Sequence, residues 1–403
     1  MRSFVVPLLA SAAIVGVVAY AHAAGGQVVT PPKARYVMDA GTITGFAGRG
    51  GGMGAAMGMM FGGGGREARE LQLRLGSTLA PEGGKPKADH FPSPGGKMGK
   101  SLPLITPDRE PPAAGDMPEE RPRGRLLLFW GCGAKAAKGQ PVVIDFAKVA
   151  KGQMPAGLSS VRVPRDPGPT LGNSRTYGHW PNSKGGKPPS ASSSLIGEHR
   201  VAGNYTPEMR FTLAKDFMRG LSARSQSLPG GATTISWGTI PDATGYMAFA
   251  MGMKMAGNGE EPQDMVWWTS ASAKEFYGGL TDWLSPATVA RLVGEKLVMP
   301  PTQTNCTIPA EVRAAAPSMM MGTLYAYGPE ENFVHPPRPA DPKIAWNQEW
   351  TAKIRHRSMT SWMIVSPMGG AMSGEADGGG DGKSQCKPGL GGMLGGVLGG
   401  KGC

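Results

Sequence analysis

The alternation of apolar and polar positions predicts two adjacent strands between Leu228 and Met251. In the first strand, one side of the extended chain carries Thr233, Ile235 and Trp237. A Pro-Asp turn separates it from the second strand. One side of that strand carries Tyr246, Ala248 and Ala250, and the other carries Met247, Phe249 and Met251. Because the second strand is apolar on both sides, we expect both of its faces to be covered.

The same reasoning predicts strands along most of the chain, so the expected fold class is mainly β. Leu71, Leu73 and Leu75 alternate with polar residues, which predicts a strand with one buried side. Apolar runs or alternation predict further strands at 125–130, 140–146, 195–201, 208–213, 265–269, 324–327 and 350–365. One helix is expected near 286–298, because Ser285 and Pro286 suit the N-cap and the first helical position. Residues 151–194 are rich in Pro, Gly and Ser and predict no regular element.

Trp237 and the sequence Ala243-Thr244-Gly245-Tyr246 resemble the first strands of a fibronectin type III domain. In that family a Trp ends strand B, and a loop ending in Ala-x-Gly-Tyr leads into strand C. The resemblance implies that Trp237 and Tyr246 are core residues between two sheets, without a catalytic role. A general immunoglobulin-like sandwich fits the same pattern.

Composition divides the chain into five segments. We expect a signal peptide at 1–23, a Gly- and Met-rich linker at 24–64, a β-rich domain at 65–222, a fibronectin type III-like β domain at 223–366 that contains the helix, and a Gly-rich tail at 367–403. Both β domains are expected to be sandwich-like. The Gly-rich ends are expected to be disordered, because they bury too little surface to offset the chain entropy. Within the linker, residues 36–44 are a candidate short strand.

The first 23 residues have the organisation of a secretory signal peptide. Arg2 precedes an apolar run from Phe4 to Val18, and Ala21-His22-Ala23 forms a small-x-small cleavage site. No later segment approaches the roughly 18 consecutive apolar residues of a membrane span. In these features the chain resembles an exported bacterial protein. We therefore expect the mature protein in the periplasm or outside the cell, without a transmembrane segment.

The charge distribution does not indicate a nucleic-acid partner. The net charge of +12 arises from sparse acidic residues, and no block of five like charges occurs in the 403 residues. The 63 glycines concentrate near residues 41–65 and 369–402, which leaves the middle of the chain ordinary in composition.

All four cysteines, Cys132, Cys306, Cys386 and Cys403, lie in the part of the chain that is expected to be exported. In an oxidising compartment this even count permits two disulfides. Cys386 with Cys403 and Cys132 with Cys306 are natural pairs, although all three possible pairings of four cysteines stay open. No two cysteines have the spacing of a zinc site.

No residue pattern predicts a catalytic site or a bound cofactor. Cys132 is expected to form half of a disulfide rather than to act as a nucleophile. The histidines lack the spacing of metal ligands, and no Gly-x-Ser-x-Gly sequence occurs. No spacing favours one pair of carboxylates among Asp145, Asp242, Asp264, Glu275 and Asp282.

Methionine is unusually frequent, with 25 residues. Thioether sulfur binds Cu(I), so the linker methionines are weak candidate copper ligands; they are Met53, Met57, Met59 and Met60. A second group, Met251, Met253 and Met255, shares one side of a predicted strand. The alternative is that methionine serves as an adaptable apolar side chain.

These observations predict a non-enzymatic binding or structural module at the cell envelope, with no cofactor. Its expected partners are an envelope polysaccharide or another envelope protein. The candidate ligand surface consists of Trp267, Trp268, Tyr277 and Trp283, and the alternative is that these aromatic rings fill the core. Two other functions stay open: a hydrolase acting on an envelope polymer, and a periplasmic copper-binding protein that uses its Met-rich segments.

Overall fold

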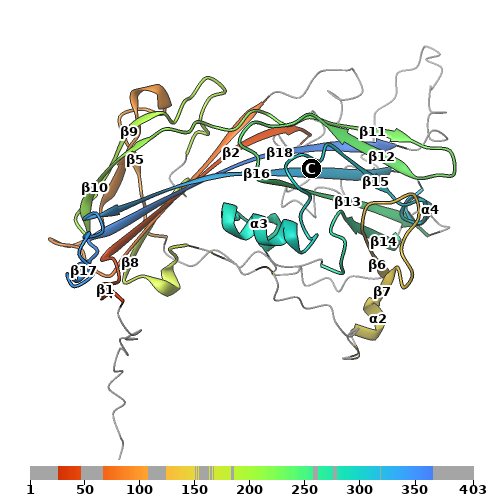
Figure 1. Cartoon of the computed structure of the whole chain (residues 1–403), viewed down its shortest axis with the longest axis horizontal. Coiled ribbons are helices and arrows are strands. Elements are labelled where there is room, and N and C mark those ends of the chain that lie inside the picture. Colours follow the sequence, from red (N-terminus) through yellow and green to blue (C-terminus); the bar gives the residue numbers. More distant parts are fainter. Residues whose placement is uncertain are drawn as a thin grey trace, which may run out of the picture.

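The computed structural model describes residues 26–46, 67–107, 124–149 and 151–365, apart from positions 152, 154–162, 164–165, 167, 183–185, 257–261, 276–278 and 318. The expected signal peptide, most of the expected linker and the expected tail lie outside the described residues. The described part is mainly β, as expected, with several sheets and a few short helices (Figure 1).

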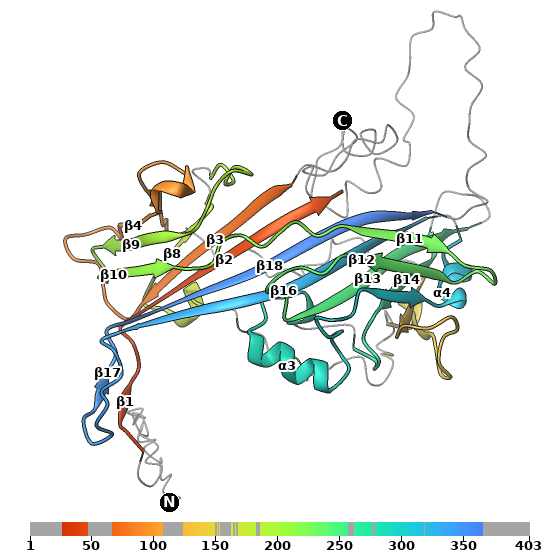
Figure 2. The same ribbon diagram turned by 45° about the horizontal axis from the view of Figure 1, so that its top comes forward.

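A nine-stranded sheet is the scaffold of the protein. In spatial order its strands are β7 (Val142–Asp145), β6 (Arg125–Trp130), β14 (Pro262–Thr269), β13 (Gly245–Met255), β16 (Met319–His335), β18 (Trp350–Val365), β2 (Ala34–Gly45), β3 (Ala68–Ser77) and β8 (Thr176–Trp180). Neighbouring strands are antiparallel, except for the parallel pairs β6 with β14 and β2 with β18. The long strands β16, β18 and β2 lie side by side in the middle of the sheet (Figure 2).

Two smaller sheets lie over one face of the nine-stranded sheet, at its opposite ends (Figure 1). The four-stranded sheet consists of β10 (Thr206–Leu213), β9 (Gly197–Gly203), β4 (Ala88–Phe91) and β5 (Leu102–Pro103). The three-stranded sheet consists of β11 (Ala223–Ser227), β12 (Thr233–Trp237) and β15 (Asn305–Ile308). A short parallel pair, β1 (Val29–Thr30) with β17 (Trp346–Asn347), extends from one end.

Each small sheet encloses its own hydrophobic core against the shared large sheet. Under the four-stranded sheet, Leu73 of β3 and Met209 of β10 are completely buried in one cluster. Under the three-stranded sheet, Ile235 of β12 and Trp268 of β14 are completely buried in another. On this face the two layers therefore enclose two separate cores.

The expected domain boundary between residues 222 and 223 separates the two covering sheets but not the strands of the large one. The four-stranded sheet is built from residues 88–213 and the three-stranded sheet from residues 223–308. The nine-stranded sheet, in contrast, takes β2, β3, β6, β7 and β8 from before the boundary and β13, β14, β16 and β18 from after it.

Two parts of the sequence-based interpretation are wrong. The stretch assigned to the linker contains β2, a 12-residue strand between β18 and β3; the candidate strand at 36–44 is confirmed as part of β2, which belongs to the scaffold. Residues 151–194 also contain a strand, because β8 pairs with β3 and closes one edge of the sheet.

The helices are short, and the expected one is present. They are α2 (Phe146–Val149), α3 (Pro286–Gly294) and α4 (Ala310–Ala315), with single 3-10 turns at Pro94–Gly96, Leu171–Asn173 and Gly279–Thr281. The Ser285 side chain caps α3 by accepting a hydrogen bond from the amide of Thr288. The helix ends before the expected residue 298, because Lys296 adopts a left-handed conformation, with a φ of 60°.

α3 covers the middle of the face opposite the two small sheets (Figure 2). Its buried Val289 and Leu292 pack with Met247 of β13 and Tyr325 of β16. A Cβ atom at Gly245 would lie 2.8 Å from Val289 Cγ1, so glycine is required for this close approach. α3 and the segment around it therefore bury the middle part of the second face of the large sheet.

Trp237 and Tyr246 are both buried, and they contact each other across the two layers. Trp237 belongs to β12 of the three-stranded sheet, and Tyr246 belongs to β13 of the large sheet. Their ring centroids are 5.5 Å apart, and the Tyr246 hydroxyl accepts a hydrogen bond from the amide of Ile240. This hydrogen bond thus holds the turn between β12 and β13 against the second core.

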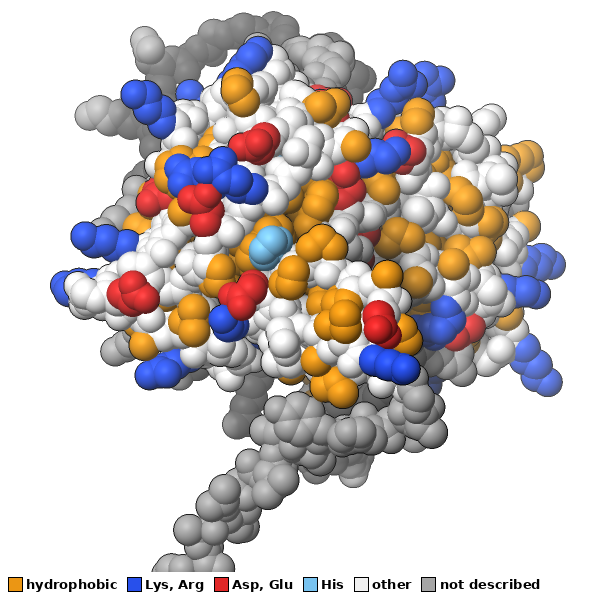
Figure 3. Space-filling view, turned by 60° about the vertical axis from the view of Figure 1, so that its left-hand side comes forward, with side chains coloured by type: hydrophobic (Ala, Val, Ile, Leu, Met, Phe, Trp, Pro, Cys, Tyr) orange, Lys and Arg blue, Asp and Glu red, His pale blue; other side chains and the backbone are white. Residues whose placement is uncertain are grey.

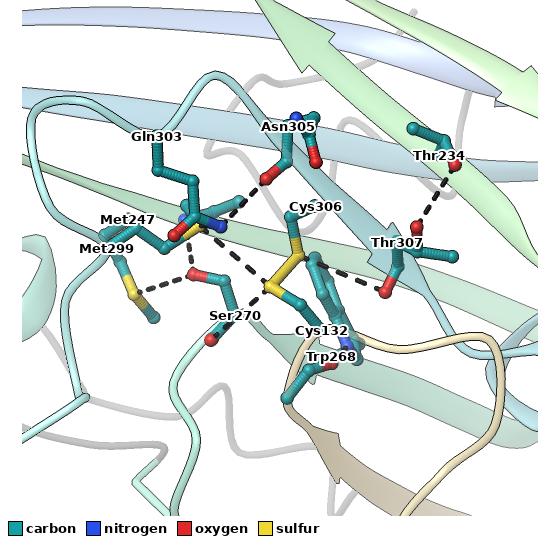
Figure 4. Close-up of a disulfide and its surroundings, with 12 residues drawn as sticks. Cys132, Thr234, Met247, Trp268, Ser270, Met299, Gln303, Asn305, Cys306 and Thr307 are labelled. Carbon is teal, nitrogen blue, oxygen red and sulfur yellow. Dashed lines mark hydrogen bonds between the residues drawn. A yellow bond between two sulfur atoms is a disulfide. The ribbon is translucent and has the colours of Figure 1, made fainter.

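Cys132 and Cys306 form a disulfide, one of the pairings that the sequence left open (Figure 4). Cys132 follows β6 of the large sheet, and Cys306 belongs to β15 of the three-stranded sheet. The bond therefore connects the two layers over a sequence separation of 174 residues. Cys386 and Cys403 lie outside the described residues.

The C132S/C306S variant should have a free energy of unfolding lower by roughly 2–5 kcal/mol, because the bond restricts a long loop in the unfolded chain. Guanidinium denaturation of the oxidised wild type and the variant measures this difference. Peptide mapping of the native protein without reductant should recover one peptide pair that contains Cys132 and Cys306. A map joining Cys132 to Cys386 or Cys403 would contradict the structure.

Tyr36, His90 and His199 form a buried chain of hydrogen bonds in the first core. The Tyr36 hydroxyl lies 3.0 Å from His90 Nδ1, and His90 Nε2 lies 3.2 Å from His199 Nδ1. His199 Nε2 lies 2.7 Å from the carbonyl oxygen of Leu195, so His199 must donate there. With neutral imidazoles the remaining donors follow: His90 donates to His199, and Tyr36 donates to His90.

Burial keeps this chain neutral. It lowers the pKa of His90 well below the ordinary value, with a further decrease from the neighbouring His199. Burial also lowers the pKa of His199, although the Leu195 carbonyl and Glu331 act in the opposite direction. Protonation of either imidazole would therefore destroy the single consistent arrangement of donors and acceptors.

The free energy of unfolding should decrease as the pH falls below about 6.5. In that range the unfolded chain binds protons at both histidines while the folded protein does not, so each contributes up to about 1.4 kcal/mol per pH unit. Urea denaturation at pH 7.5, 6.5 and 5.5 measures the slope. The variant H335N, at an exposed histidine, should keep it. An unfolding free energy that is constant or rises toward acidic pH would refute the neutral chain.

Candidate functional site

Of the four aromatic residues predicted as a ligand surface, the three that the structure describes do not form one exposed surface. Trp268 is completely buried, and its indole nitrogen donates to the carbonyl oxygen of Gly131 at 2.9 Å, so it is a core residue. Trp283 is only 7% exposed. Trp267 is half-buried and lies on the opposite side of β14 from Trp268. Tyr277 lies outside the described residues.

Asp39 of β2 is the centre of a buried ion network on the face that carries α3. Its completely buried carboxylate accepts hydrogen bonds from Arg355 of β18 at 2.6 and 3.0 Å and another from Arg74 of β3. Arg355 also donates to the carbonyl oxygens of Trp283, at 3.0 Å, and Asp166, at 3.1 Å. Burial opposes the charge of Arg355, but the hydrogen bonds that it donates to Asp39, together with the negative charges of Asp39, Asp166 and Asp282, outweigh burial and raise the pKa of the guanidinium group.

Arg357 and Glu70 continue this network and explain the burial of Trp283. The Arg357 guanidinium lies 3.9 Å from the centre of the Trp283 ring and donates to Glu70 at 3.2 Å. It also donates to the carbonyl oxygen of Thr281, at 3.1 Å. The arginines therefore attach the segment around Trp283 to the sheet, which is a structural role.

Four of the five carboxylates considered for a hydrolase have basic or backbone partners, and the fifth, Glu275, is buried. Asp264 of β14 accepts two hydrogen bonds from Arg125 of β6, at 2.7 and 3.0 Å. Asp145 of β7 is paired in register with the same arginine, so Arg125 stands between the two acids. Asp242 forms an ion pair with Lys215 at 3.1 Å, and Asp282 accepts from the amide of Trp283. The contacts printed for these four carboxylates therefore do not bring two of them together across a shared site.

Among the described residues, no group of three or more His, Cys, Asp or Glu side chains could hold a metal ion. The candidate copper ligands Met53, Met57, Met59 and Met60 lie outside the described residues. The Cys132 sulfur is part of the disulfide, so it is not a thiol nucleophile.

The end of the large sheet beyond α3 presents a different surface. On this face Met251 of β13 lies opposite Trp267 of β14 on one side and Met321 of β16 on the other. Met321 in turn lies opposite Met363 of β18. A single row across four neighbouring strands thus consists of one tryptophan and three methionines.

A second row lies one alternation further along the same strands. Met253 of β13 lies opposite Met265 of β14, and Met319 of β16 lies opposite Val365 of β18. Met320, between Met319 and Met321, points to the other face and is buried in the second core. We call the six methionine side chains in the two rows the methionine face; they are Met251, Met253, Met265, Met319, Met321 and Met363.

The methionine face is open to solvent at its centre. Met251 and Met253 are both 38% exposed, and the other four methionines are partly exposed. The expectation that both faces of this strand are covered is therefore wrong from Met251 onward. α3 covers β13 only as far as Phe249, which is partly buried against the hydrophobic cluster that contains Val289 and Leu292 of α3.

The sequence did contain a signal for this surface. Methionine alternates at Met251 and Met253, and a run of three methionines begins at Met319. The strand pairing that brings these segments together joins positions about seventy residues apart in the chain, as in the pair Met251 with Met321. Only the strand order shows that they share one face.

The opposite end of the molecule has ordinary surface chemistry. Acidic and basic side chains are interspersed there, without a large region of one sign (Figure 3). On the four-stranded sheet, Glu208 lies between Arg200 and Arg210, at 3.1 and 2.7 Å. This end therefore gives no indication of a highly charged partner.

Neither a protein-family model nor a curated protein matches the chain. Among the described helices, none has the length and apolar character needed to cross a lipid bilayer. The functional interpretation therefore depends on the chemistry of the methionine face.

The D39N variant should lower the free energy of unfolding by about 3–5 kcal/mol, because it removes the buried carboxylate that accepts two hydrogen bonds from the buried Arg355. Chemical denaturation of the two proteins measures the difference. The matched control is E198Q, which removes a carboxylate from the exposed pair with Arg210. It should leave the stability unchanged. Equal effects of the two substitutions would show that Asp39 is not central to the fold.

Proposed function

We propose that the protein is an exported, non-enzymatic binding or structural module of the cell envelope, in the periplasm or outside the cell. The observation that carries this proposal is the methionine face, an apolar surface on a rigid sheet that is open to solvent at its centre. Large exposed apolar surfaces rimmed by other elements are typical of interaction sites. Its partner is an envelope polysaccharide or another envelope protein.

The disulfide supports the proposed location. A cross-link between two sheets persists in oxidising compartments and is rare where thiols are kept reduced. The Cys132–Cys306 bond connects the two layers next to the second core. It can stabilise the folded protein only in a compartment that is oxidising enough for the disulfide to form. The amino-terminal signal-peptide pattern supports the same location.

We also propose that the protein consists of two sandwich-like units that share the large sheet, the second of them similar to a fibronectin type III domain. The two separate cores under two covering sheets support this division. The fibronectin-like part is supported by β12 and β13, which lie in opposite layers and bring Trp237 against Tyr246.

The M251E/M253E variant should lose association with the envelope, because two carboxylates at the centre of the methionine face would have to be desolvated on contact. The assay is co-sedimentation of the purified mature protein with the envelope fraction of the cell that produces it. We expect at least a tenfold decrease in the bound fraction.

The matched control is I196E/I344E, which introduces the same charges at exposed apolar residues away from this face. It should bind like the wild type. Equal binding by M251E/M253E and the wild type, with both proteins folded by circular dichroism, would refute the methionine face as the contact surface.

The same experiment separates the binding module from the alternative hydrolase. A hydrolase acting on the polymer would release soluble fragments over time, in proportion to the amount of enzyme. A binding module leaves the polymer intact while it sediments with it.

A further inference from the structure

The methionine face contains more thioether sulfur than an apolar contact surface requires. Leucine has a similar volume and lacks sulfur, so it would serve as well in a purely apolar contact. Instead, methionine occupies six positions in two adjacent rows, across β14, β13, β16 and β18. What distinguishes the face is therefore a set of soft, neutral donor atoms.

The strand register brings these donors within reach of a common point. Directly opposed residues on neighbouring strands have Cβ atoms about 4.5–5.5 Å apart. Met251 has Met321 opposite it on one strand, and Met321 has Met363 opposite it on the next. Methionine has three flexible side-chain bonds beyond its Cα atom. Three neighbouring thioethers can therefore turn toward one ion above the middle strand.

From this arrangement we propose that the methionine face binds a soft monovalent metal ion, of the class of Cu(I) and Ag(I). Thioether ligands select Cu(I) over hard cations such as Mg²⁺ and Ca²⁺, which require oxygen ligands. The three ligands are Met251, Met321 and Met363, with Met253 as the neighbouring donor one alternation along β13.

The surroundings of these ligands favour a single positive charge. The other members of the two rows, Trp267 and Val365, are apolar, and so is Leu126, which lies opposite Met265 on β6. They supply no carboxylate to balance a divalent ion. Trp267 lies opposite Met251, where the face of an indole ring can stabilise a cation.

This inference rests on the proposal that the methionine face is a binding face, but not on an envelope partner. It names a ligand that can be tested with the purified protein. Ag(I) is the suitable probe, because it has the charge and ligand preference of Cu(I) and needs no reductant that would open the Cys132–Cys306 disulfide.

The test uses the full mature chain in a background that removes Cys386, Cys403 and the four linker methionines, namely C386S/C403S together with Met→Leu at positions 53, 57, 59 and 60. Isothermal titration gives the Ag(I) affinity and stoichiometry, and carbon-13-labelled methionine methyl groups report the ligands by NMR. We expect one ion per chain, with shifts of the Met251, Met321 and Met363 methyl signals.

The decisive comparison is between two double variants. M251L/M321L removes two ligands at nearly constant volume and should weaken Ag(I) binding at least tenfold. M98L/M209L changes two methionines in the first core region and should leave the affinity unchanged.

Equal affinities in the two variants, or no methyl shift on the methionine face, would overturn the metal site. If the metal does not bind but M251E/M253E still loses envelope association, this inference fails and the proposed function stands. If the metal binds but envelope association does not depend on the methionine face, this inference stands and the proposed function fails.

Discussion

The pairing of Asp39 with Arg355 is the contact on which the large sheet depends. It joins β2 to β18 in the parallel pair that connects residues 316 positions apart, and Arg74 extends it to β3. A buried carboxylate between two arginines tolerates neither slippage of the register nor loss of one member, because either change leaves an uncompensated charge in the interior. The network therefore specifies one alignment of the three strands.

That alignment also determines what each face of the sheet can do. On one face, the small sheets cover two hydrophobic cores with a disulfide at one end and a neutral histidine chain at the other. On the opposite face, the ion network is followed by α3 and then by the methionine face. The buried charged side chains around Asp39 are thus paired with one another, and the exposed methionines lie at the end that α3 does not cover.

Local patterns predicted most of the strands, including 125–130 and 350–365, whose partners lie far away in the sequence, but they did not predict the order of the strands. The alternation at β12 and β13 and the Ser285-Pro286 helix start were sufficient because each is a property of a short segment. β2 was underestimated because Asp39 breaks its apolar pattern and its arginine partners lie far along the chain. The roles of Trp267 and Trp268 could not be separated, since adjacent residues of one strand point to opposite layers, and only the strand order shows which layer is covered.

The parallel pairing of β2 with β18 also sets the order in which the protein can assemble. A ribosome makes β2 and β3 near the start and β18 near the end, so the two early strands have each other but not their central neighbour for most of synthesis. During that interval β2 presents an unsatisfied edge to other chains. Until β18 pairs with it, β2 can therefore exchange strands with another chain, so the last strand to be made is the one that closes the sheet.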